Sequence, residues 1–279
     1  MKIDKIIVPL DYTEAAKTGL QYAISLGRKL NAHLILLNSY TVNYAPSAGA
    51  SMSTMPHPAD MDVVTLRNIN EKKLHNHIQE IPELSTVDHT AQIAFGTPVE
   101  AICTLAEEEK ADLIVIGTDG ASEIEGFFMG TISEKVSRKA PCSVLVVPSA
   151  NAPMPMDSIG LALDTEPTHS SLGLAVLEAI ARTSGAKLRI IHIAEGDDVT
   201  FKKEDVVAHY KEALKEVKPT FHVFQNDDPK EGIISFLEQY PMDLLALVYR
   251  EHGFFERLFQ PGVRRKILFE TQRPCLILK

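Results

Sequence analysis

ADLIVIGTDGASEIEGFFMGTI, residues 111–132, contains the clearest structural signal in the sequence. Its apolar run at 113–116 is typical of a parallel strand that is buried on both faces. Gly117 and Gly120 follow this run, and Gly130 opens the next helical pattern. Glycines between a strand and a helix N-terminus allow backbone N–H groups to approach an anion. The stretch therefore predicts a phosphate-binding loop, and the alternative interpretation is a simple turn.

The spacing of the glycines distinguishes this loop from the common phosphate-binding motifs. Together with Thr131 it reads G-x2-G-x9-G-T, which is neither the Walker A pattern nor the Rossmann G-x-G-x-x-G. It resembles the nucleotide motif G-x2-G-x9-G-[ST] of the universal stress protein family, and all four positions match. Four such positions in the context of strand, loop and helix favour a binding site over a turn.

Alternating strands and helices occupy the first half of the chain. Thr13 is the predicted N-cap of a helix from Glu14 to about residue 30. Strands are expected at 5–10, 33–38, 87–95, 113–116 and 143–147, and the other helices at 61–81, 98–109 and up to about residue 139. Residues 40–60 lack periodicity and are interpreted as a flap near the binding cleft. The alternation predicts an α/β fold with a doubly wound parallel sheet and helices on both faces.

Candidate site residues follow three separate strands of this predicted sheet. Asp11, Ser39 and Gly117 each lie at the end of an expected strand. Ligands of open α/β sheets bind beyond the C-terminal ends of the strands, at the point where the strand order switches direction. We therefore expect these three residues to meet at one edge of the sheet.

The second half of the sequence repeats the first. Asp164 aligns with Asp11, and between residues 98 and 135 a constant offset of 131 pairs Asp112 with Asp243. A repeat of this length indicates two copies of one domain. We place the first domain at residues 1–148, a proline-containing linker at 149–157 and the second domain at 158–279.

Through this repeat, the resemblance to universal stress proteins covers the whole chain. It implies two tandem Rossmann-like domains of the nucleotide-binding alpha hydrolase-like type, each with a five-stranded parallel sheet and an ATP-binding architecture. Domains of this family pair through their last strands. The resemblance therefore implies an internal pseudo-dimer and leaves room for a further homodimer.

The second copy lacks the residues that the loop motif needs. In place of the three glycines and the threonine it has Val248, Glu251, Pro261 and Gly262. Valine resists the open backbone geometry of glycine, Glu251 brings a negative charge towards a phosphate, and Pro261 has no N–H to donate. The sequence therefore predicts a single nucleotide site, in the first domain.

The resemblance also implies a role for each residue of that site. Asp11 would lie beside the nucleoside, near the ribose or a metal-bound water, and is the candidate metal ligand. The other contacts would be Pro9 beside the nucleoside, the Ser39 backbone at the adenine edge, Ile116 near the base, and Gly117, Gly120, Gly130, Thr131 and Ile132 at the phosphates. From the residues alone, Asp11 could cap the following helix and Thr131 could be an N-cap, and both roles are compatible with nucleotide binding.

The predicted phosphate loop contains several acidic residues. Asp119, Glu123 and Glu125 lie in it, and no Lys or Arg occurs from residue 117 to 131. The charge of a triphosphate would then be balanced by backbone amides and a divalent cation, which we expect to be Mg²⁺. ATP, ADP and AMP all remain open as the bound nucleotide.

The composition argues against several classes of partner. The 279 residues carry a net charge of −9, so no surface for nucleic acid or an anionic membrane is expected. No apolar run approaches the ~18 residues of a membrane span, and the first residues lack the apolar core of a signal peptide. The expected location is the cytoplasm, where Cys103, Cys142 and Cys275 would remain reduced and pack as core residues.

Two classes of function agree with these features. The first is an ATP-binding universal stress protein with a regulatory or stress-response role, in which nucleotide occupancy changes the flap and a surface for an unknown protein partner. The second is a nucleotide-independent interaction or assembly module with a vestigial site. The sequence shows no P-loop lysine, no catalytic Ser-His-Asp arrangement and no arginine at a position that a catalytic motif would give it. At most slow ATP hydrolysis is therefore expected.

Overall fold

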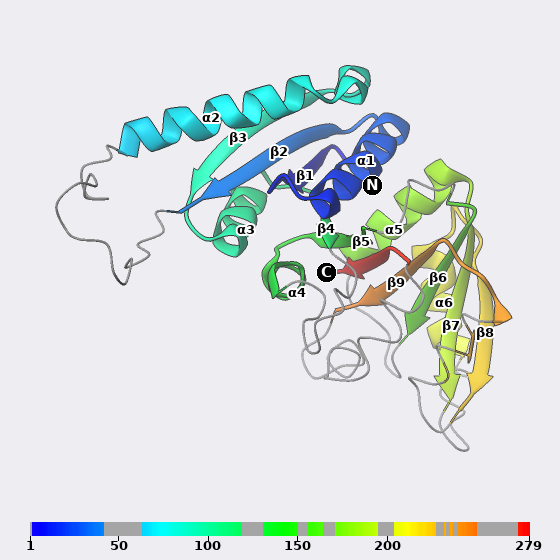
Figure 1. The fold of residues 1–279 in the computed structure, drawn as a ribbon. Coiled ribbons are helices and arrows are strands. Elements are labelled where there is room, and N and C mark those ends of the chain that lie inside the picture. Colours follow the sequence, from blue (N-terminus) through cyan, green and yellow to red (C-terminus); the bar gives the residue numbers. More distant parts are fainter. Residues whose placement is uncertain are drawn as a thin grey trace.

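Strands and helices alternate along almost the whole described chain (Figure 1). The computed structural model describes residues 2–41, 63–118, 131–149, 156–163, 171–194, 204–226, 232, 235–236, 239–249 and 273–279. The first half contains β1 (Lys5–Pro9), α1 (Glu14–Leu30), β2 (His33–Tyr40), α2 (Val63–Gln79), the 3-10 helix η2 (Pro82–Thr86), β3 (His89–Phe95), α3 (Pro98–Glu108), β4 (Leu113–Thr118), α4 (Thr131–Lys139) and β5 (Ser143–Pro148). The second half contains β6 (Ser158–Leu163), α5 (Ser171–Ser184), β7 (Lys187–Ala194), α6 (Glu204–Ala213), β8 (Thr220–Gln225), β9 (Leu244–Val248) and β10 (Cys275–Leu278).

The strands form one ten-stranded sheet in the order β3-β2-β1-β4-β5-β10-β9-β6-β7-β8. Read outward from its centre, each half has the same order of five strands, and within each half neighbouring strands are parallel. The halves meet where β5 and β10 pair antiparallel, with Leu276 opposite Leu145. The predicted fold of two tandem doubly wound domains is confirmed, and the two sheets are joined edge to edge through their last strands.

The repeat extends to individual hydrogen bonds. Asp112 accepts hydrogen bonds at Oδ2 from the backbone N–H groups of Asp4 and Lys5, at 2.8 and 3.0 Å. Its partner in the sequence alignment, Asp243, accepts hydrogen bonds at Oδ2 from the N–H groups of residues 157 and 158, both at 2.9 Å. In both halves, a carboxylate before the fourth strand therefore holds the beginning of the first strand.

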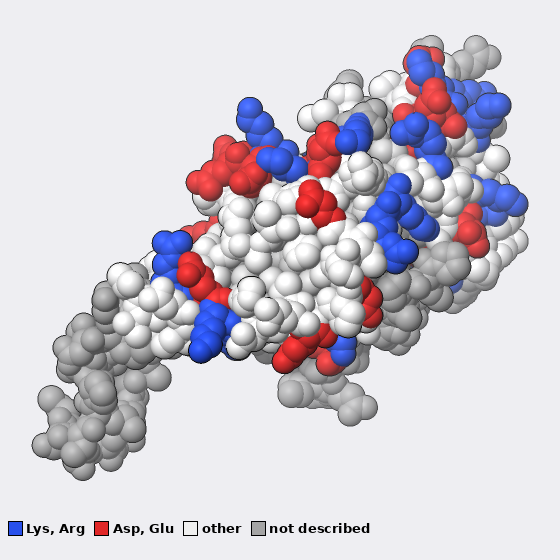
Figure 2. Space-filling model, turned by 90° about the horizontal axis from the view of Figure 1, so that it is seen from above, with Lys and Arg blue, Asp and Glu red and all other residues white. Residues whose placement is uncertain are grey.

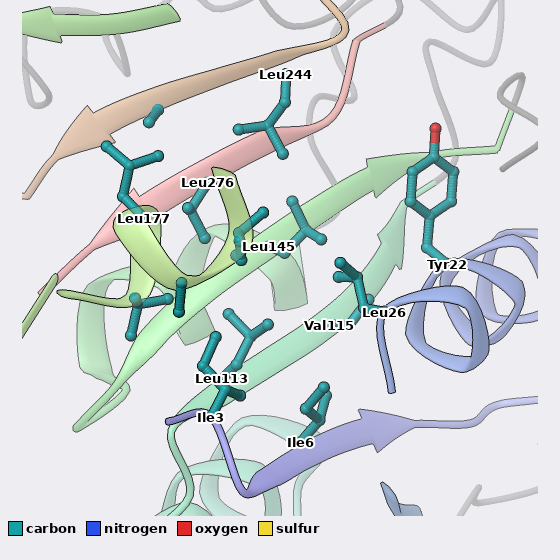
Figure 3. Close-up of a cluster of buried hydrophobic side chains, with 14 of the residues drawn as sticks. Ile3, Ile6, Tyr22, Leu26, Leu113, Val115, Leu145, Leu177, Leu244 and Leu276 are labelled. Carbon is teal, nitrogen blue, oxygen red and sulfur yellow. The ribbon is translucent and has the colours of Figure 1, made fainter. Parts of the chain in front are cut away.

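Buried apolar residues fill both faces of the sheet. Ile6 and Val8 belong to the cluster beneath α1, while Ile7 belongs to the cluster on the opposite face, as the alternation of side chains along a strand requires. Each cluster contains residues of both halves. Figure 3 shows Leu145 of β5 and Leu276 of β10 next to each other within one of them. The two halves thus share a continuous core.

Most element boundaries agree with the sequence analysis. The helix predicted from Glu14 begins there, and Thr13 is its N-cap because its hydroxyl accepts a hydrogen bond from the N–H of Ala16 at 3.2 Å. β2 is two residues longer than predicted, and β3 begins at His89 because the preceding residues form η2, which has Pro82 in its first turn. Most of the predicted flap, residues 42–60, lies outside the described residues.

The cysteines occupy environments of different depth. Cys275 is buried in the core, whereas Cys103 and Cys142 are partly exposed. Burial raises the pKa of the Cys142 thiol to about 12, which keeps it protonated near neutral pH.

Within the described part of the chain, no helix combines the length and the apolar character needed to cross a membrane.

Candidate functional site

The C-terminal ends of β2, β1 and β4 lie side by side, with β1 between the other two. Ile7 of β1 pairs with Ile114 of β4, and Pro9 pairs with Leu37 of β2. Continuing these registers brings the ends of the three strands to one edge of the sheet. The structure therefore brings together the segments of Pro9, Asp11, Ser39, Ile116 and Gly117, as the sequence analysis expected.

Gly117 is in close contact with the first turn of α1. A Cβ atom added at Gly117 would lie 1.8 Å from the carbonyl oxygen of Ala15. A Cβ atom added at Gly19, one turn further along α1, would lie 2.6 Å from the backbone nitrogen of Gly117. Glycine is therefore required at both positions for α1 to approach the end of β4, whatever ligand the loop binds.

Asp11 lies in the turn between β1 and α1, and its side chain is exposed. Its Oδ1 atom accepts hydrogen bonds from the backbone N–H of Thr13 at 3.1 Å and from the Thr13 hydroxyl at 2.6 Å. The capping role that the sequence analysis considered for Asp11 is thus present, and it acts through Thr13. Because these bonds use one oxygen of an exposed carboxylate, the other oxygen can still face a ligand.

Two neighbouring residues shape this edge of the sheet, and the sequence analysis did not single them out. Asn38 is buried, and its Nδ2 donates a hydrogen bond of 2.6 Å to the carbonyl oxygen of Leu10, which ties the end of β2 to the turn after β1. Tyr12 has a positive φ of 68°, and burial raises the pKa of its hydroxyl. A polar residue at the end of an apolar strand was the available signal for Asn38, whereas no pattern indicated the backbone of Tyr12.

The remaining site residues differ in what the structure describes of them. Ile116 is only 5% exposed and packs in the buried cluster beneath α3 and α4. Thr131 is the first residue of α4, and Ile132 after it is 36% exposed. Gly120 and Gly130 lie outside the described residues.

In the second half, Val248 ends β9 at the position that matches Gly117. The other three residues of the degenerate motif, Glu251, Pro261 and Gly262, lie outside the described residues. The structure therefore describes one of these four positions, and the loss of the second nucleotide site stays a prediction.

Charges on the described surface are mixed in sign. Figure 2 shows acidic and basic side chains interspersed around a broad uncharged area on the face that it presents. Among the described residues, no group of three or more His, Cys, Asp or Glu side chains could hold a metal ion. Any divalent cation at Asp11 would therefore need further ligands from outside these described residues, such as a bound molecule or water.

Comparison with known proteins identifies the family. The model of the Universal stress protein family matches residues 2–148, which is more than half of the chain. The chain belongs to the universal stress protein family.

Known proteins are similar to this chain over one half or over its whole length. A universal stress protein of Methanocaldococcus jannaschii is 28% identical over 145 residues, which cover 51% of this chain and 81% of that protein. The crystal structure of a universal stress protein from Archaeoglobus fulgidus has the same fold over the whole chain, with 100% of this chain and 99% of that chain covered at 16% identity and a TM-score of 0.74. A universal stress protein crystallised in complex with cAMP is 22% identical, and the match covers 53% of this chain and 99% of that chain, with a TM-score of 0.39.

Proposed function

We propose that this universal stress protein binds one adenine nucleotide, in its first half, and that occupancy of the site has a regulatory or stress-response role. The observation that carries the proposal is the meeting of two segments at the switch point of the first sheet. The first turn of α1, which directly follows the turn that contains Asp11, lies against Gly117 at the end of β4, and the rest of the glycine motif follows in the sequence. Ligands of doubly wound sheets bind at this place.

The proposed phosphate contacts come from the loop after β4 and from the first turn of α4. Thr131 is the first residue of α4, and the N–H groups in the first turn of a helix have no partner within the helix. These groups and the positive end of the helix dipole attract an anion. We assign Gly120, Gly130, Thr131 and Ile132 to the phosphates, Pro9 and Asp11 to the nucleoside, and Ser39 and Ile116 to the base.

Mg²⁺ fits this proposal only as the companion of a nucleotide. Proteins usually bind this ion through one or two carboxylates together with substrate phosphates and water. Asp11 supplies one exposed carboxylate with an oxygen outside its bonds to Thr13. When bound, the ion would neutralise phosphate charge that the acidic loop cannot balance. Any ATP hydrolysis is expected to be slow, and Asp11→Asn should then abolish turnover while measurable, though weaker, nucleotide binding persists.

Nucleotide content measured directly on the protein tests this function. The freshly purified protein would be denatured and its adenine nucleotide quantified per chain by chromatography, before and after incubation with ATP and Mg²⁺. We expect close to one nucleotide per chain, and its loss in Gly130→Val, since a valine would block the approach of the backbone to a phosphate. The matched control is Gly262→Val in the corresponding loop of the second half, which should leave the content unchanged.

The opposite result favours the second function class. If the unmodified protein carries no nucleotide and takes none up from ATP and Mg²⁺, the nucleotide site is vestigial and the protein is an interaction or assembly module. Equal loss of nucleotide from both variants would contradict the single site. The domain limits at 1–148 and 158–279, the cytoplasmic location and a homodimer remain predictions from the sequence.

A further inference from the structure

Tyr12, between Asp11 and Thr13, has a backbone conformation that its side chain does not favour. Its φ of 68° lies in the left-handed region, where residues other than glycine, asparagine and aspartate are uncommon. Such a conformation persists where the surrounding structure enforces it, and it occurs preferentially at functional sites. The contacts of the Tyr12 ring show what enforces it here.

The ring of Tyr12 is held by two side chains of α2. The Nζ atom of Lys73 lies 4.0 Å from the ring centroid, which is the geometry of a cation–π interaction. The imidazole ring of His77 meets the tyrosine ring at 5.0 Å between centroids and at an interplanar angle of 86°, an edge-to-face contact. Because Lys73 and His77 are four residues apart, they lie on the same face of α2.

The hydroxyl group of Tyr12 does not contribute to this attachment. Among the described residues it is buried without a hydrogen-bond partner. The aromatic ring itself therefore provides the contact with α2, and a phenylalanine would keep that ring.

The attached turn also determines where the Asp11 carboxylate points. Asp11 accepts two hydrogen bonds from Thr13, and Thr13 in turn accepts one from the N–H of Ala16. Tyr12 links the first two of these residues, so its left-handed backbone is part of the same turn that joins the Asp11 side chain to Thr13. A turn released from α2 could relax Tyr12 towards a favoured φ and would lose this arrangement.

We propose that Tyr12 is a positioning residue for the nucleotide site: clamped by Lys73 and His77, it fastens the turn of residues 11–13 to α2 and so orients the Asp11 carboxylate. This inference rests on the proposed function. It also assigns a role to α2, a helix whose described residues have not otherwise been connected with the site. Displacement of α2 would be transmitted to Asp11 through the Tyr12 ring.

Four variants separate this role from general destabilisation. Tyr12→Gly removes the ring while permitting the positive φ, and Lys73→Met removes the cation while retaining a long side chain on α2. Tyr12→Phe keeps the ring. Lys72→Met is the matched control, because this lysine is exposed and points about 100° away around the same helix.

Two measurements are made on each full-length variant: the ATP dissociation constant in the presence of Mg²⁺, after removal of bound nucleotide, and amide hydrogen exchange of residues 11–16 without nucleotide. Tyr12→Gly and Lys73→Met should exchange faster in this segment. Tyr12→Gly should bind ATP about tenfold more weakly, at the lower end of the effect of removing a residue that supports a binding residue. Lys73→Met should bind ATP about two- to fivefold more weakly, because the lysine is exposed and its cation–π contact is correspondingly modest. Tyr12→Phe and Lys72→Met should match the unmodified protein in both measurements.

Each contrary outcome has a defined meaning. If the unmodified protein binds ATP and the Tyr12→Gly and Lys73→Met variants bind it equally well, the positioning role is wrong while the nucleotide site stands. If Lys72→Met weakens binding as much as Lys73→Met, the effect is one of surface charge and the clamp is rejected. If the unmodified protein binds no adenine nucleotide, the proposed function fails and the positioning role fails with it.

Discussion

At the scale of single residues, Gly117 has a structural role that is independent of any ligand. Its missing side chain makes room for the carbonyl group of Ala15, which an added Cβ would approach to 1.8 Å. Gly117→Ala should therefore destabilise even the nucleotide-free protein, by about 1–3 kcal/mol, since the strand and the helix would have to move apart. Urea denaturation of the nucleotide-free protein measures this effect, and an unchanged free energy of unfolding would leave Gly117 with a role in ligand binding alone.

At the scale of elements, β1 and β6 are each held at their beginning by one carboxylate. Asp112 and Asp243 each accept two backbone hydrogen bonds at this place. Asp112→Ala and Asp243→Ala should each lower the free energy of unfolding by about 1–3 kcal/mol, because the N–H groups lose a charged acceptor. Asp4→Ala, which removes an exposed ion pair with Lys2, is the control and should change stability by less than about 0.5 kcal/mol. Different losses of unfolding free energy in the two variants would show that this carboxylate does not have the same role in both halves.

At the scale of the whole molecule, the antiparallel pairing of β5 with β10 joins the two halves into a single sheet. Leu276 is fully buried opposite Leu145, in a cluster that contains residues of both halves. Leu276→Ala should lower the free energy of unfolding by about 2–5 kcal/mol and keep a single transition. Hydrogen exchange should then accelerate in β1 and β4 as well as in β6 and β9. Acceleration confined to the second half would contradict a shared cooperative unit.

Most of the fold could be predicted because its signals are local. Buried parallel strands appear as short apolar runs such as 113–116, and helix starts appear as capping residues such as Thr13. The internal repeat added the tandem architecture, and the last-strand pairing expected from the family resemblance corresponds to the contact of β5 with β10. The family was also recognisable from four positions of one loop, because a backbone anion site restricts which residues can occupy it.

Less of the candidate site could be predicted, because its geometry depends on residues far apart in the sequence. The order of the strands and helices, the repeat and the edge of the sheet at which Asp11, Ser39 and Gly117 meet could all be inferred from the amino-acid sequence. The fit of Gly117 against the carbonyl group of Ala15, and the contact of a left-handed Tyr12 with α2, became visible only in the folded chain. The physical reason is that periodicity and capping are properties of neighbouring residues, whereas close approach and backbone strain arise when distant segments pack against each other.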